Sequence, residues 1–589
     1  MDLNLVVIIA YLVAIVVFGL FMSIYVKKAD DYFVGGRAFN HWVVAGSVIG
    51  TNVAAIYLVG PAGVAYNSGV PVLMIAWTGN MLAAFSAALF VPRLRRLHIT
   101  TVPDILETRY NRVVRLLPVI LWLFYYAFFT GNNLYALCLC LSTVLDWPVQ
   151  RLIWTVGPVV VIYSSTAGLL GAAYTDIIQT FLMVIGGVIL LPLAMRQVGG
   201  VESFIAQTPP ELFTFWKAGT NGINWQDLIM FTLTGFPFWC TSQYLLQRTF
   251  GGRSIKDASK GLALAAILTG PLTLCYILPG MCGRIIYSGD KALANSDQIL
   301  PMLFKDIIPA GLGGIFIAAL IAASYSTIAA VLNASATLFT NDIYRPARPA
   351  CSSTHYTWVG RGVTVLVGLI AMVFALNVEK LGGIINANYE IMTFFEPPIF
   401  VVVCAALFWR SITNKAAIAT LVGGTLVNAI CTWGLHMGPA YRSFVIFPAC
   451  FAILFLVSAL TRNSAKQQNR VDRFLATLSP GALDLRSTRF LAGLAISVLS
   501  LAAFVLCSVF EQRLPKPANV FVFLALVTGF VAGVLVMLPK VIGREVDSPL
   551  GENDALSKSL VNRVLSSGYL WLAVYAFAGG LMFFLYYAG

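Results

Sequence analysis

Long apolar segments follow one another along almost the whole chain, and each is long enough to form a membrane-spanning helix, which takes about 20 residues. Only 11% of the residues are charged, against about 25% in a typical soluble chain, and the mean hydropathy is +0.83. These observations predict an all-α polytopic membrane protein with about sixteen transmembrane helices. The predicted spans are residues 3–26, 41–66, 70–92, 116–144, 152–170, 174–195, 226–247, 259–283, 312–342, 357–377, 385–409, 415–434, 443–461, 489–510, 518–539 and 566–588.

The positions of the lysines and arginines predict how the chain is threaded through the bilayer. Residues 3–26 are too long for a signal-peptide core and are interpreted as the first span. With the N-terminus placed outside, basic residues gather on inside loops at 93–115, 248–260 and 462–489. We therefore expect a multi-pass plasma-membrane protein (in the cell inner membrane of a bacterium) with both termini outside. The net charge of +13 follows this topology and indicates a lipid bilayer, not nucleic acid, as partner.

Clusters of residues that carry enzyme or metal chemistry are not found in the sequence. The ten cysteines are scattered, and Cys138 and Cys140 have no partner at metal-ligand spacing. The four histidines lie at or near span ends. No loop carries a nucleophile beside a base, and the longer loops leave no room for a soluble catalytic domain. We expect a protein that is not an enzyme.

The apolar segment 313–344 has one small and polar face. On a helix, Ala319, Ala323, Ser326, Thr327 and Ala330 fall within an arc of roughly 100°. Small residues let a neighbouring backbone come close. Two hydroxyl oxygens beside a close backbone are suitable ligands for a dehydrated monovalent cation. The alternative is that both hydroxyls bond to carbonyls of the preceding helical turn.

Two of the predicted spans are interrupted. Residues 45–69 contain several glycines and a proline, with Thr51 and Asn52 at the middle, and residues 226–247 contain Gly235 and Pro237 followed by polar residues. Glycine and proline inside a span are typical of a discontinuous helix, whose freed carbonyls bind a ligand. The two interruptions stand five spans apart. This spacing predicts a pair of inverted repeats that hold a solute between the two breaks.

The predicted domain organisation follows from these spans. Residues 1–40 form an N-terminal span and an inside loop. Residues 41–410 form the transport core, with a first repeat at 41–196 and a second at 226–410. Two further spans occupy 411–461, and residues 462–589 form an inside linker and extra C-terminal spans, for which the sequence suggests no function.

Several motifs, taken in order over roughly residues 1–460, resemble the sodium:solute symporter family, the relatives of the sodium/glucose and sodium/proline symporters. These motifs are SSTAGLLGAAYTDIIQ at 164–179, TSQYLLQR at 241–248, LPG at 278–280, LNASATLFTNDIY at 332–344 and ALFWR at 406–410. The resemblance implies a five-plus-five inverted-repeat core with broken first and sixth core helices. It also implies solute uptake coupled to the entry of Na⁺.

The resemblance further implies a sodium site between the first and eighth core helices. Placed by motif, its ligands are the carbonyls of Gly50, Val53 and Ala323 and the hydroxyls of Ser326 and Thr327.

Some relatives bind a second sodium through a carboxylate that matches Asp176 and through hydroxyls one turn further on. Those hydroxyl positions are Ala329 and Ala330 here, so we expect one sodium as coupling ion. Asp176 is assigned to the ion pathway; the alternative is a helix N-cap beside a short loop.

The resemblance also places the solute cavity. Most positions that bind sugar hydroxyls in relatives carry small or aromatic residues here, and Asn52 is retained. Rings in such a cavity could stack on a ring or face a cation, or they could be ordinary core residues. Phe238 and Trp239 match an aromatic pair at the inner gate of relatives. The predicted cavity residues are Asn52, Tyr57, Trp77, Asn132, Phe238, Trp239, Thr269, Tyr389 and Glu396.

Glu396 is unusual because it is an ionisable residue in the middle of a span, directly before Pro397 and Pro398. It could face a cationic solute or take up a proton. It could also be a neutral acid that satisfies backbone groups freed by the prolines.

Taken together, these features predict a sodium-coupled symporter that carries a small organic solute into the cell by alternating access, a sugar or polyol being favoured. The alternatives are a symporter for a small organic cation or amine, a proton-coupled transporter using Asp176 or Glu396, and a channel or sensor on the same fold. The sequence leaves the solute and the oligomeric state open.

Overall fold

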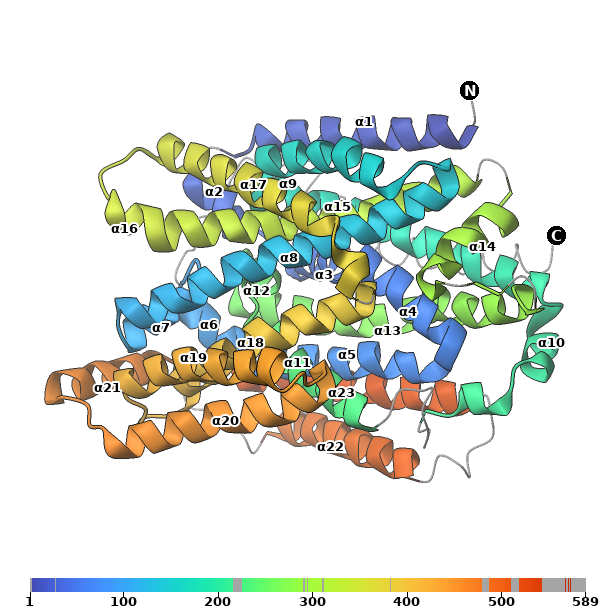
Figure 1. Cartoon of the computed structure of the whole chain (residues 1–589). Helices are drawn as coiled ribbons and strands as arrows, with labels where there is room; N and C mark the ends of the chain where they lie inside the picture. The colour runs from blue at the N-terminus through green and yellow to red at the C-terminus, as the bar shows by residue number, and fades with distance from the viewer. Residues whose placement is uncertain are drawn as a thin grey trace.

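The computed structural model describes residues 3–542 apart from residues 27, 216–224, 290–291, 294, 310–311, 382, 479–486 and 510–517, together with residues 567, 570 and 573. Within these residues the secondary structure is helical, apart from one isolated bridge between Phe39 and Gly252. Most of the long helices run alongside one another, as Figure 1 shows. The predicted all-α architecture is therefore present.

The helices are numbered along the chain. The first are α1 (Leu3–Ser23), α2 (Ala29–Val34), α3 (His41–Asn52), α4 (Ala55–Ser68), α5 (Leu73–Leu89), α6 (Val91–Arg96), α7 (Pro103–Arg109), α8 (Arg112–Leu145) and α9 (Val149–Gln197). Next come α10 (Gly200–Gln207), α11 (Trp225–Cys240), α12 (Gln243–Phe250), α13 (Ile255–Ile286), η5 (Ser296–Gln298), α14 (Ile299–Ile307), α15 (Leu312–Leu338), η6 (Phe339–Tyr344), α16 (Arg345–Ala347), α17 (Ser353–Ala375) and α18 (Ile384–Phe408). The last described are α19 (Asn414–Ala429), α20 (Pro439–Leu460), α21 (Ala465–Leu478), α22 (Thr488–Val509) and α23 (Ala518–Ile542).

Ten helices of the described part are long and apolar enough to cross a membrane, or up to eleven if one bent pair counts as a single span. The count of about sixteen from the apolar runs stays a prediction. The span at 566–588 lies almost entirely outside the described residues. The segments 152–170 and 174–195 belong to one helix, α9, which is interrupted only at Gly168, where φ is 58°.

Both predicted interruptions are present as breaks between helices. α3 and α4 meet at an angle of 55°, and Val53 between them has φ −83° and ψ 74°, outside the helical range. The second break separates α11 from α12 at Thr241 and Ser242, whose N–H groups both donate to the Pro237 carbonyl at 2.9 Å. Proline at 237 lies in the last turn of α11 and removes one helical hydrogen bond there.

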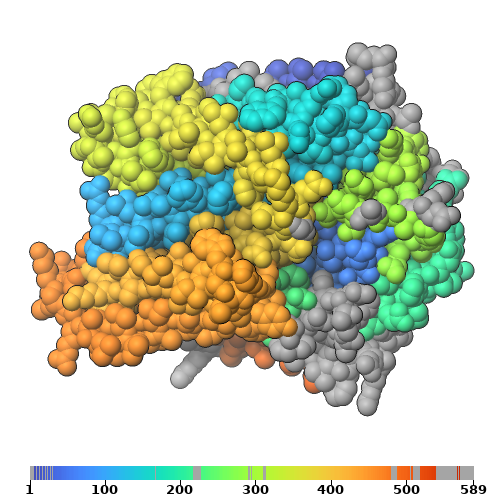
Figure 2. Space-filling model, viewed as in Figure 1, coloured from blue at the N-terminus to red at the C-terminus, as the bar shows by residue number. Residues whose placement is uncertain are grey.

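α15 forms the centre of the bundle. It packs against α9, α8, α3 and α17, and almost all of its residues are buried. Its small side chains explain this position, because alanine and serine let neighbouring helices approach closely. Figure 2 shows an outer face of the molecule, where α8 lies between α17 on one side and α19 and α20 on the other.

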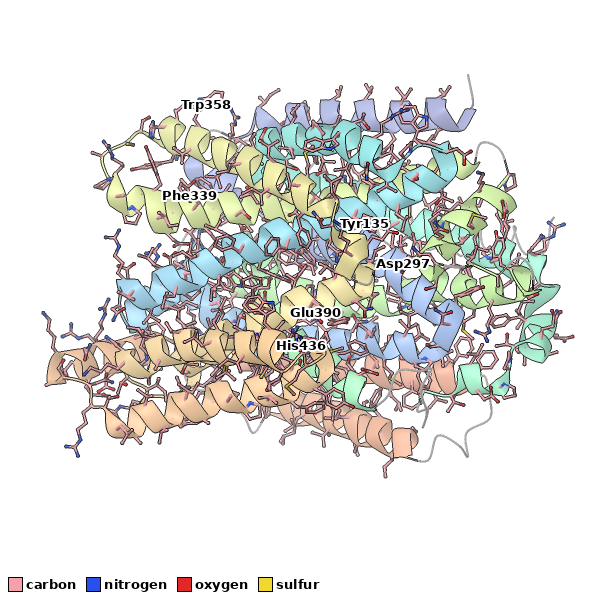
Figure 3. All side chains as sticks on the ribbon, viewed as in Figure 1. Tyr135, Asp297, Phe339, Trp358, Glu390 and His436 are labelled. Atoms are coloured by element: carbon pink, nitrogen blue, oxygen red, sulfur yellow. The ribbon has the colours of Figure 1, made fainter. Side chains whose placement is uncertain are left out.

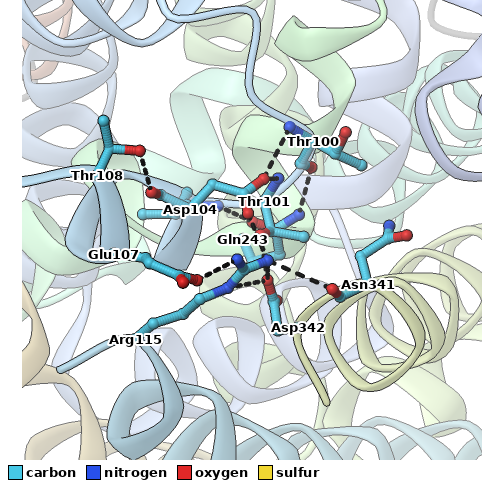
Figure 4. A network of polar contacts seen from close by, with 10 residues as sticks. Thr100, Thr101, Asp104, Glu107, Thr108, Arg115, Gln243, Asn341 and Asp342 are labelled. Atoms are coloured by element: carbon cyan, nitrogen blue, oxygen red, sulfur yellow. Dashed lines mark hydrogen bonds and ion pairs between the residues drawn. The ribbon is translucent and has the colours of Figure 1, made fainter. Parts of the chain in front are cut away.

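One end of the bundle, where α6, α7 and α21 lie together, is called the basic end here (left in Figure 1). Arg115 of α8 joins three carboxylates at this end. Its Nε donates to Asp342 at 2.8 Å, and its Nη groups reach Asp104 and Glu107 of α7, both at 2.5 Å (Figure 4). Because Asp342 belongs to η6 and is fully buried, this network ties the end of α15 to α7 and α8.

A second set of contacts at the basic end involves α12. The Gln243 side chain accepts from the Val102 N–H at 2.7 Å and donates to the Thr100 carbonyl at 3.3 Å (Figure 4). Gln247 donates to Thr337 of α15 at 2.8 Å. The half-helix that follows the second break is therefore bonded to the segment between α6 and α7 and to α15 at the basic end.

Candidate functional site

The break between α3 and α4 frees the two carbonyls that the sequence assigns to a cation. In a continuous helix, the Ala54 N–H would donate to Gly50 and the Tyr57 N–H to Val53. Here Ala54 donates to the Asn52 carbonyl at 3.0 Å and Tyr57 to the Ala54 carbonyl at 2.9 Å. The carbonyls of Gly50 and Val53 thus lose their helical partners and can accept a ligand.

α15 brings two hydroxyls and a carbonyl to this break. Thr327 Oγ1 donates to the Thr51 carbonyl at 2.8 Å and lies 3.2 Å from the Ala323 carbonyl in its own helix. Ser326 Oγ, one residue earlier, is equally buried. The structure therefore gathers both predicted hydroxyls and the Ala323 carbonyl beside the broken helix. Hydroxyl and carbonyl oxygens are the ligands that a hard cation prefers.

A third helix, α9, contributes the carboxylate of Asp176 to this candidate site. Its Oδ1 accepts from Ser326 and its Oδ2 from Ser47, both at 2.6 Å. Asp176 also forms a buried ion pair with Arg248 of α12, at 3.3 Å. The N-cap interpretation of Asp176 is wrong, because the residue lies in the interior of α9 and not at its start. A negative charge is thus placed directly beside one of the two predicted cation-binding hydroxyls.

Gly50 is the point where α3 packs on α9. A Cβ at this position would lie 2.8 Å from the Asp176 carbonyl oxygen and 3.1 Å from Thr180 Oγ1. The neighbouring contact, from Thr180 Oγ1 to the Gly46 carbonyl at 3.0 Å, keeps the two helices together. Only glycine fits here, and its absence of a side chain is what lets the carboxylate of Asp176 approach the break.

A cavity of about 90 Å³ lies next to this site, between the two broken helices. It is lined by residues of α4, α5, α11, α13 and α18 and by the α3–α4 break. The lining residues are Asn52, Val53, Tyr57, Leu58, Pro61, Val72, Ile75, Ala76, Gly79, Asn80, Phe231, Thr234, Gly235, Phe238, Trp239, Thr269, Leu272, Thr273, Tyr276, Ile277, Tyr389 and Met392.

The cavity is lined by uncharged residues, several of which are aromatic. None of the lining residues is a lysine, arginine, histidine, aspartate or glutamate. The rings of Tyr57 and Phe238 meet edge to face at 6.3 Å, and those of Phe231 and Tyr389 lie 4.9 Å apart. Asn80 Nδ2 has no hydrogen-bond partner among the described residues. The wall therefore offers flat apolar faces and a few neutral polar groups to a bound molecule.

Three of the residues predicted for the cavity lie outside its lining. Trp77 is fully buried against Phe215, with ring centroids 5.9 Å apart. Asn132 Nδ2 donates to the Ile384 carbonyl at 3.0 Å and so joins α8 to the start of α18. Glu396 is buried one turn beyond Met392, which lines the cavity. Trp77 and Glu396 lie on helices that line the cavity and Asn132 lies on α8, but none of the three residues is part of the lining.

The sequence reasoning missed Ser47, Arg248 and Asn80. Ser47 lies one turn before Gly50 on α3, where only the packing of α9 reveals its role. The sequence pattern places Arg248 in a cluster of basic residues on an inside loop, yet the side chain is fully buried. A signal is present in the sequence, since Arg248 lies only a few residues after the predicted second break, and a charge so close to a break is expected to meet a partner.

Two broken helices that frame a neutral cavity, with hydroxyl and carbonyl oxygens gathered at one break, are typical of a secondary active transporter. A family model described as "Sodium:solute symporter family" matches residues 32–424. The chain belongs to the sodium:solute symporter family.

Curated relatives agree with this assignment. The chain is 29% identical to a sodium/glucose cotransporter of Vibrio parahaemolyticus over 424 residues, covering 67% of this chain and 78% of that protein. It is 25% identical to sodium/glucose cotransporter 4 of Danio rerio (72% and 71% covered) and 26% identical to sodium/myo-inositol cotransporter 2 of Bos taurus (72% and 69%). The chain is thus a sodium-coupled transporter and not an enzyme.

Solved structures share the fold. A Na⁺-coupled sialic acid symporter, described in a substrate-bound outward-open state, superimposes with a TM-score of 0.70 at 21% identity and covers 78% of this chain and 98% of its own. A nucleobase-cation-symport-1 family transporter superimposes with a TM-score of 0.52 at 11% identity, with coverages of 75% and 98%. The five-plus-five repeat inside this fold remains the prediction made from the two breaks.

Proposed function

We propose that the chain carries a small neutral organic solute into the cell together with one Na⁺, and that the cation binds at Gly50, Val53, Ala323, Ser326 and Thr327. The observation that carries this proposal is the meeting of the α3–α4 break with the hydroxyls of α15, directly beside an uncharged cavity. The solute contacts proposed from the cavity are Asn52, Tyr57, Phe238, Trp239, Thr269 and Tyr389.

The coupling follows from the position of the ion between two helices. Na⁺ bound by carbonyls of the break and by α15 holds α3, α4 and α15 in one arrangement, and this arrangement also shapes the adjacent cavity wall at Asn52 and Val53. Solute affinity therefore rises when the ion is bound. Entry of one charge yields about 2.3 kcal/mol per 100 mV, and a tenfold Na⁺ gradient adds about 1.4 kcal/mol. Together these terms support roughly a few-hundred-fold solute gradient.

The polarity of the cavity indicates the class of solute. A carboxylate solute would call for a lysine or arginine in the wall and an organic cation for an acid, and the lining has neither. A neutral ring with several hydroxyls fits better, since aromatic faces can stack on it and Asn52, Asn80 and Thr269 can bond to it. Sugars and polyols have this chemistry, and relatives of the chain are described as glucose and myo-inositol cotransporters.

We place the basic end in the cytoplasm and both chain termini outside, in a plasma membrane. The arginines of α6 and α7 and the basic residues of α21 lie at this end, as expected from the positive-inside rule. With this orientation the sealed basic end is the inner gate, formed by α12, η6 and the α6–α7 segment. The arrangement then corresponds to a state that is closed toward the cytoplasm.

A thermal-shift screen of the purified chain tests the proposal. Neutral sugars, polyols and a set of organic cations and carboxylates are each added in NaCl or in choline chloride. We expect at least one neutral polyhydroxylated ring to raise the melting temperature in NaCl only, and uptake of that compound into proteoliposomes to require a Na⁺ gradient. Stabilisation by charged solutes alone, or stabilisation that is equal in both salts, would contradict the proposal.

A further inference from the structure

Glu396 is a buried acid that the proposed sodium and solute sites do not use. It lies in the middle of α18, and only 1% of its surface is exposed. Neither of its carboxyl oxygens accepts a hydrogen bond from the described residues, and none of their basic side chains forms an ion pair with it. Trp122 interacts with the carboxyl, but its indole N–H does not meet hydrogen-bond geometry. A carboxylate left in this way would be very costly, so the group is neutral here.

Four tyrosines from neighbouring helices lie around Glu396. Tyr125 and Tyr126 of α8, Tyr244 of α12 and Tyr57 of α4 all interact with it electrostatically. The hydroxyls of Tyr125 and Tyr244 have no hydrogen-bond partner among the described residues. The acid therefore lies near tyrosines of three helices besides its own, and the ring of Tyr125 lies 6.3 Å from that of Phe395, the residue before Glu396.

Other elements packed on α18 leave Glu396 without a charged neighbour. Arg442 of α20 pairs with Glu390, at 2.7 Å, nearly two turns away on α18 (Glu390 is labelled in Figure 3). Asn428 of α19 donates to the Thr393 carbonyl at 2.8 Å. Among the described residues of α7 and α11, no charged side chain interacts with the carboxyl.

The cluster of tyrosines around Glu396 lies between the solute cavity and the inner gate. Met392, one turn before Glu396, lines the cavity. Tyr244 is the second residue of α12, directly after the second break, and its ring lies 6.0 Å from that of Phe238 in the cavity wall. The Tyr244 N–H donates to Tyr126 Oη at 3.3 Å. In the proposed cycle α12 moves when the inner gate opens, and such a motion would remove Tyr244 from beside the acid and let water reach it.

We propose that Glu396 is a proton-binding site of the transport cycle, which holds a proton while the inner gate is closed and releases it to water when α12 moves away. The step is a simple acid dissociation: the carboxyl O–H bond breaks, the proton passes to water, and the carboxylate remains hydrated until it is protonated again before closure. This inference rests on the proposed function, in which bound Na⁺ favours the state that is closed toward the cytoplasm.

Linkage between the two ions gives a measurable consequence. Because Na⁺ and the proton favour the same state, each raises the affinity of the chain for the other. Apparent Na⁺ affinity therefore falls as the pH rises, by at most about tenfold per pH unit for a single proton. The Glu396→Gln variant is permanently neutral with nearly the same shape, so its Na⁺ affinity is expected to stay at the low-pH value at every pH.

The test titrates the purified full chain with NaCl against choline chloride, at pH values from about 5.5 to about 8.5, and follows tryptophan fluorescence. The matched control is Glu390→Gln, which changes an acid of the same helix whose side chain is 34% exposed and already paired. We expect the Na⁺ concentration for half-saturation to rise with pH in the unchanged chain and in the control, and to be constant in Glu396→Gln.

A second measurement is proton uptake in a weakly buffered solution when Na⁺ is added. The chain without substitutions is expected to take up as much as about one proton per molecule. Glu396→Gln is expected to take up none, and Glu396→Ala replaces it in the test if Glu396→Gln does not fold. An equal pH dependence and equal proton uptake in the unchanged chain and the Glu396 variants would overturn the inference. Absence of Na⁺ binding by the unchanged chain at every pH would instead overturn the proposed function and, with it, this inference.

Discussion

At the scale of single residues, the proposed cation site combines hydroxyl and carbonyl oxygens with the buried carboxylate of Asp176. The Ser326 hydroxyl donates a hydrogen bond to Asp176 at 2.6 Å, and the Thr327 hydroxyl donates one to the Thr51 carbonyl at 2.8 Å. Donation in one direction leaves the oxygen lone pairs on the other side for a cation. Asp176 and Arg248 balance each other's charge, so a bound Na⁺ adds one net positive charge to a neutral pair of side chains.

Gly50 allows a direct residue-scale prediction. Gly50→Ala places a Cβ 2.8 Å from the Asp176 carbonyl oxygen, and overpacking of this kind costs about 1–3 kcal/mol. We expect a lower melting temperature and weaker Na⁺ binding, because α3 must move away from α9. Gly362→Ala is the control: nothing lies within 4 Å of that Cβ on α17, so Na⁺ binding should be unchanged and the helix slightly more stable, by about 0.5–1 kcal/mol. Equal behaviour of the two variants would contradict the packing argument.

At the scale of helices, the two ends of the bundle are held by different contacts. The basic end is sealed by Arg115, Gln243 and their partners (Figure 4). At the other end, Asp297 of η5 accepts from the Ile384 N–H of α18 at 3.2 Å (Figure 3), and a Cβ on Gly63 of α4 would touch the same residue. α4 and α18 both line the cavity, so the contacts of Asp297 join two helices of the cavity wall.

Removal of the Arg115 guanidinium, which joins the carboxylates at the basic end, should weaken the contacts that close this end. Arg115→Gln leaves the fully buried Asp342 unpaired, and loss of one partner of a buried pair costs about 3–5 kcal/mol. We expect a clearly lower melting temperature, and weaker Na⁺ binding because the closed inner gate is less favoured. Adding Asp342→Asn should recover much of the loss, since no buried charge then remains. An Arg115→Gln variant with an unchanged melting temperature would show that the network does not stabilise the closed end.

Asp297, at the end of the bundle opposite the basic end, should make the folding stability of the chain depend on pH. Burial raises the pKa of Asp297 above its usual value, which for aspartate is about 3.9. The stability from this group is therefore greatest below the unfolded pKa and is lost as the pH rises through the raised folded pKa. Asp297→Asn mimics the protonated form, so its melting temperature should lack this fall between about pH 4 and pH 7.

The control for this pH dependence is Asp472→Asn in α21. The hydrogen bond from Arg410 lowers the pKa of Asp472, so its contribution is present at neutral pH and is lost as the pH falls. The two variants should therefore differ from the unchanged chain with opposite slopes. Parallel slopes for both variants would contradict the assignment for Asp297.

At the scale of the whole molecule, the helices after residue 487 support the cavity from behind. α22 and α23 pack on each other, and α23 packs on α13 and α5, which line the cavity. Glycine allows the close crossing: a Cβ on Gly493 would lie 2.5 Å from the Gly533 carbonyl oxygen. Asn519 at the start of α23 donates to the Phe213 carbonyl at 2.7 Å. These two helices therefore stabilise the cavity wall, a role that apolar composition alone could not reveal.

Local features of the fold and site were predictable, and features set by packing were not. Glycine and proline weaken a helix wherever they stand, so the break at Val53 could be predicted from residues 45–69. The hydroxyl face of α15 followed from helical periodicity alone. The interior position of Asp176 did not, because α9 is interrupted at Gly168 and not at the expected loop. Trp77 lies on a lining helix but faces Phe215, and Glu396 lies one turn beyond the lining residue Met392, because which part of a helix meets the cavity depends on neighbours distant in sequence.

Equilibrium binding of radioactive Na⁺ to the purified chain tests the central claim most directly. We expect saturable binding of one ion, and a Na⁺ concentration for half-saturation that rises about fivefold or more in Ser326→Ala and in Thr327→Ala. Ser324→Ala is the matched control, because Ser324 lies on the same helix, is equally buried and donates only to the Leu320 carbonyl, at 2.9 Å; its binding should be unchanged. Unchanged binding in both the Ser326 and Thr327 variants would contradict the site.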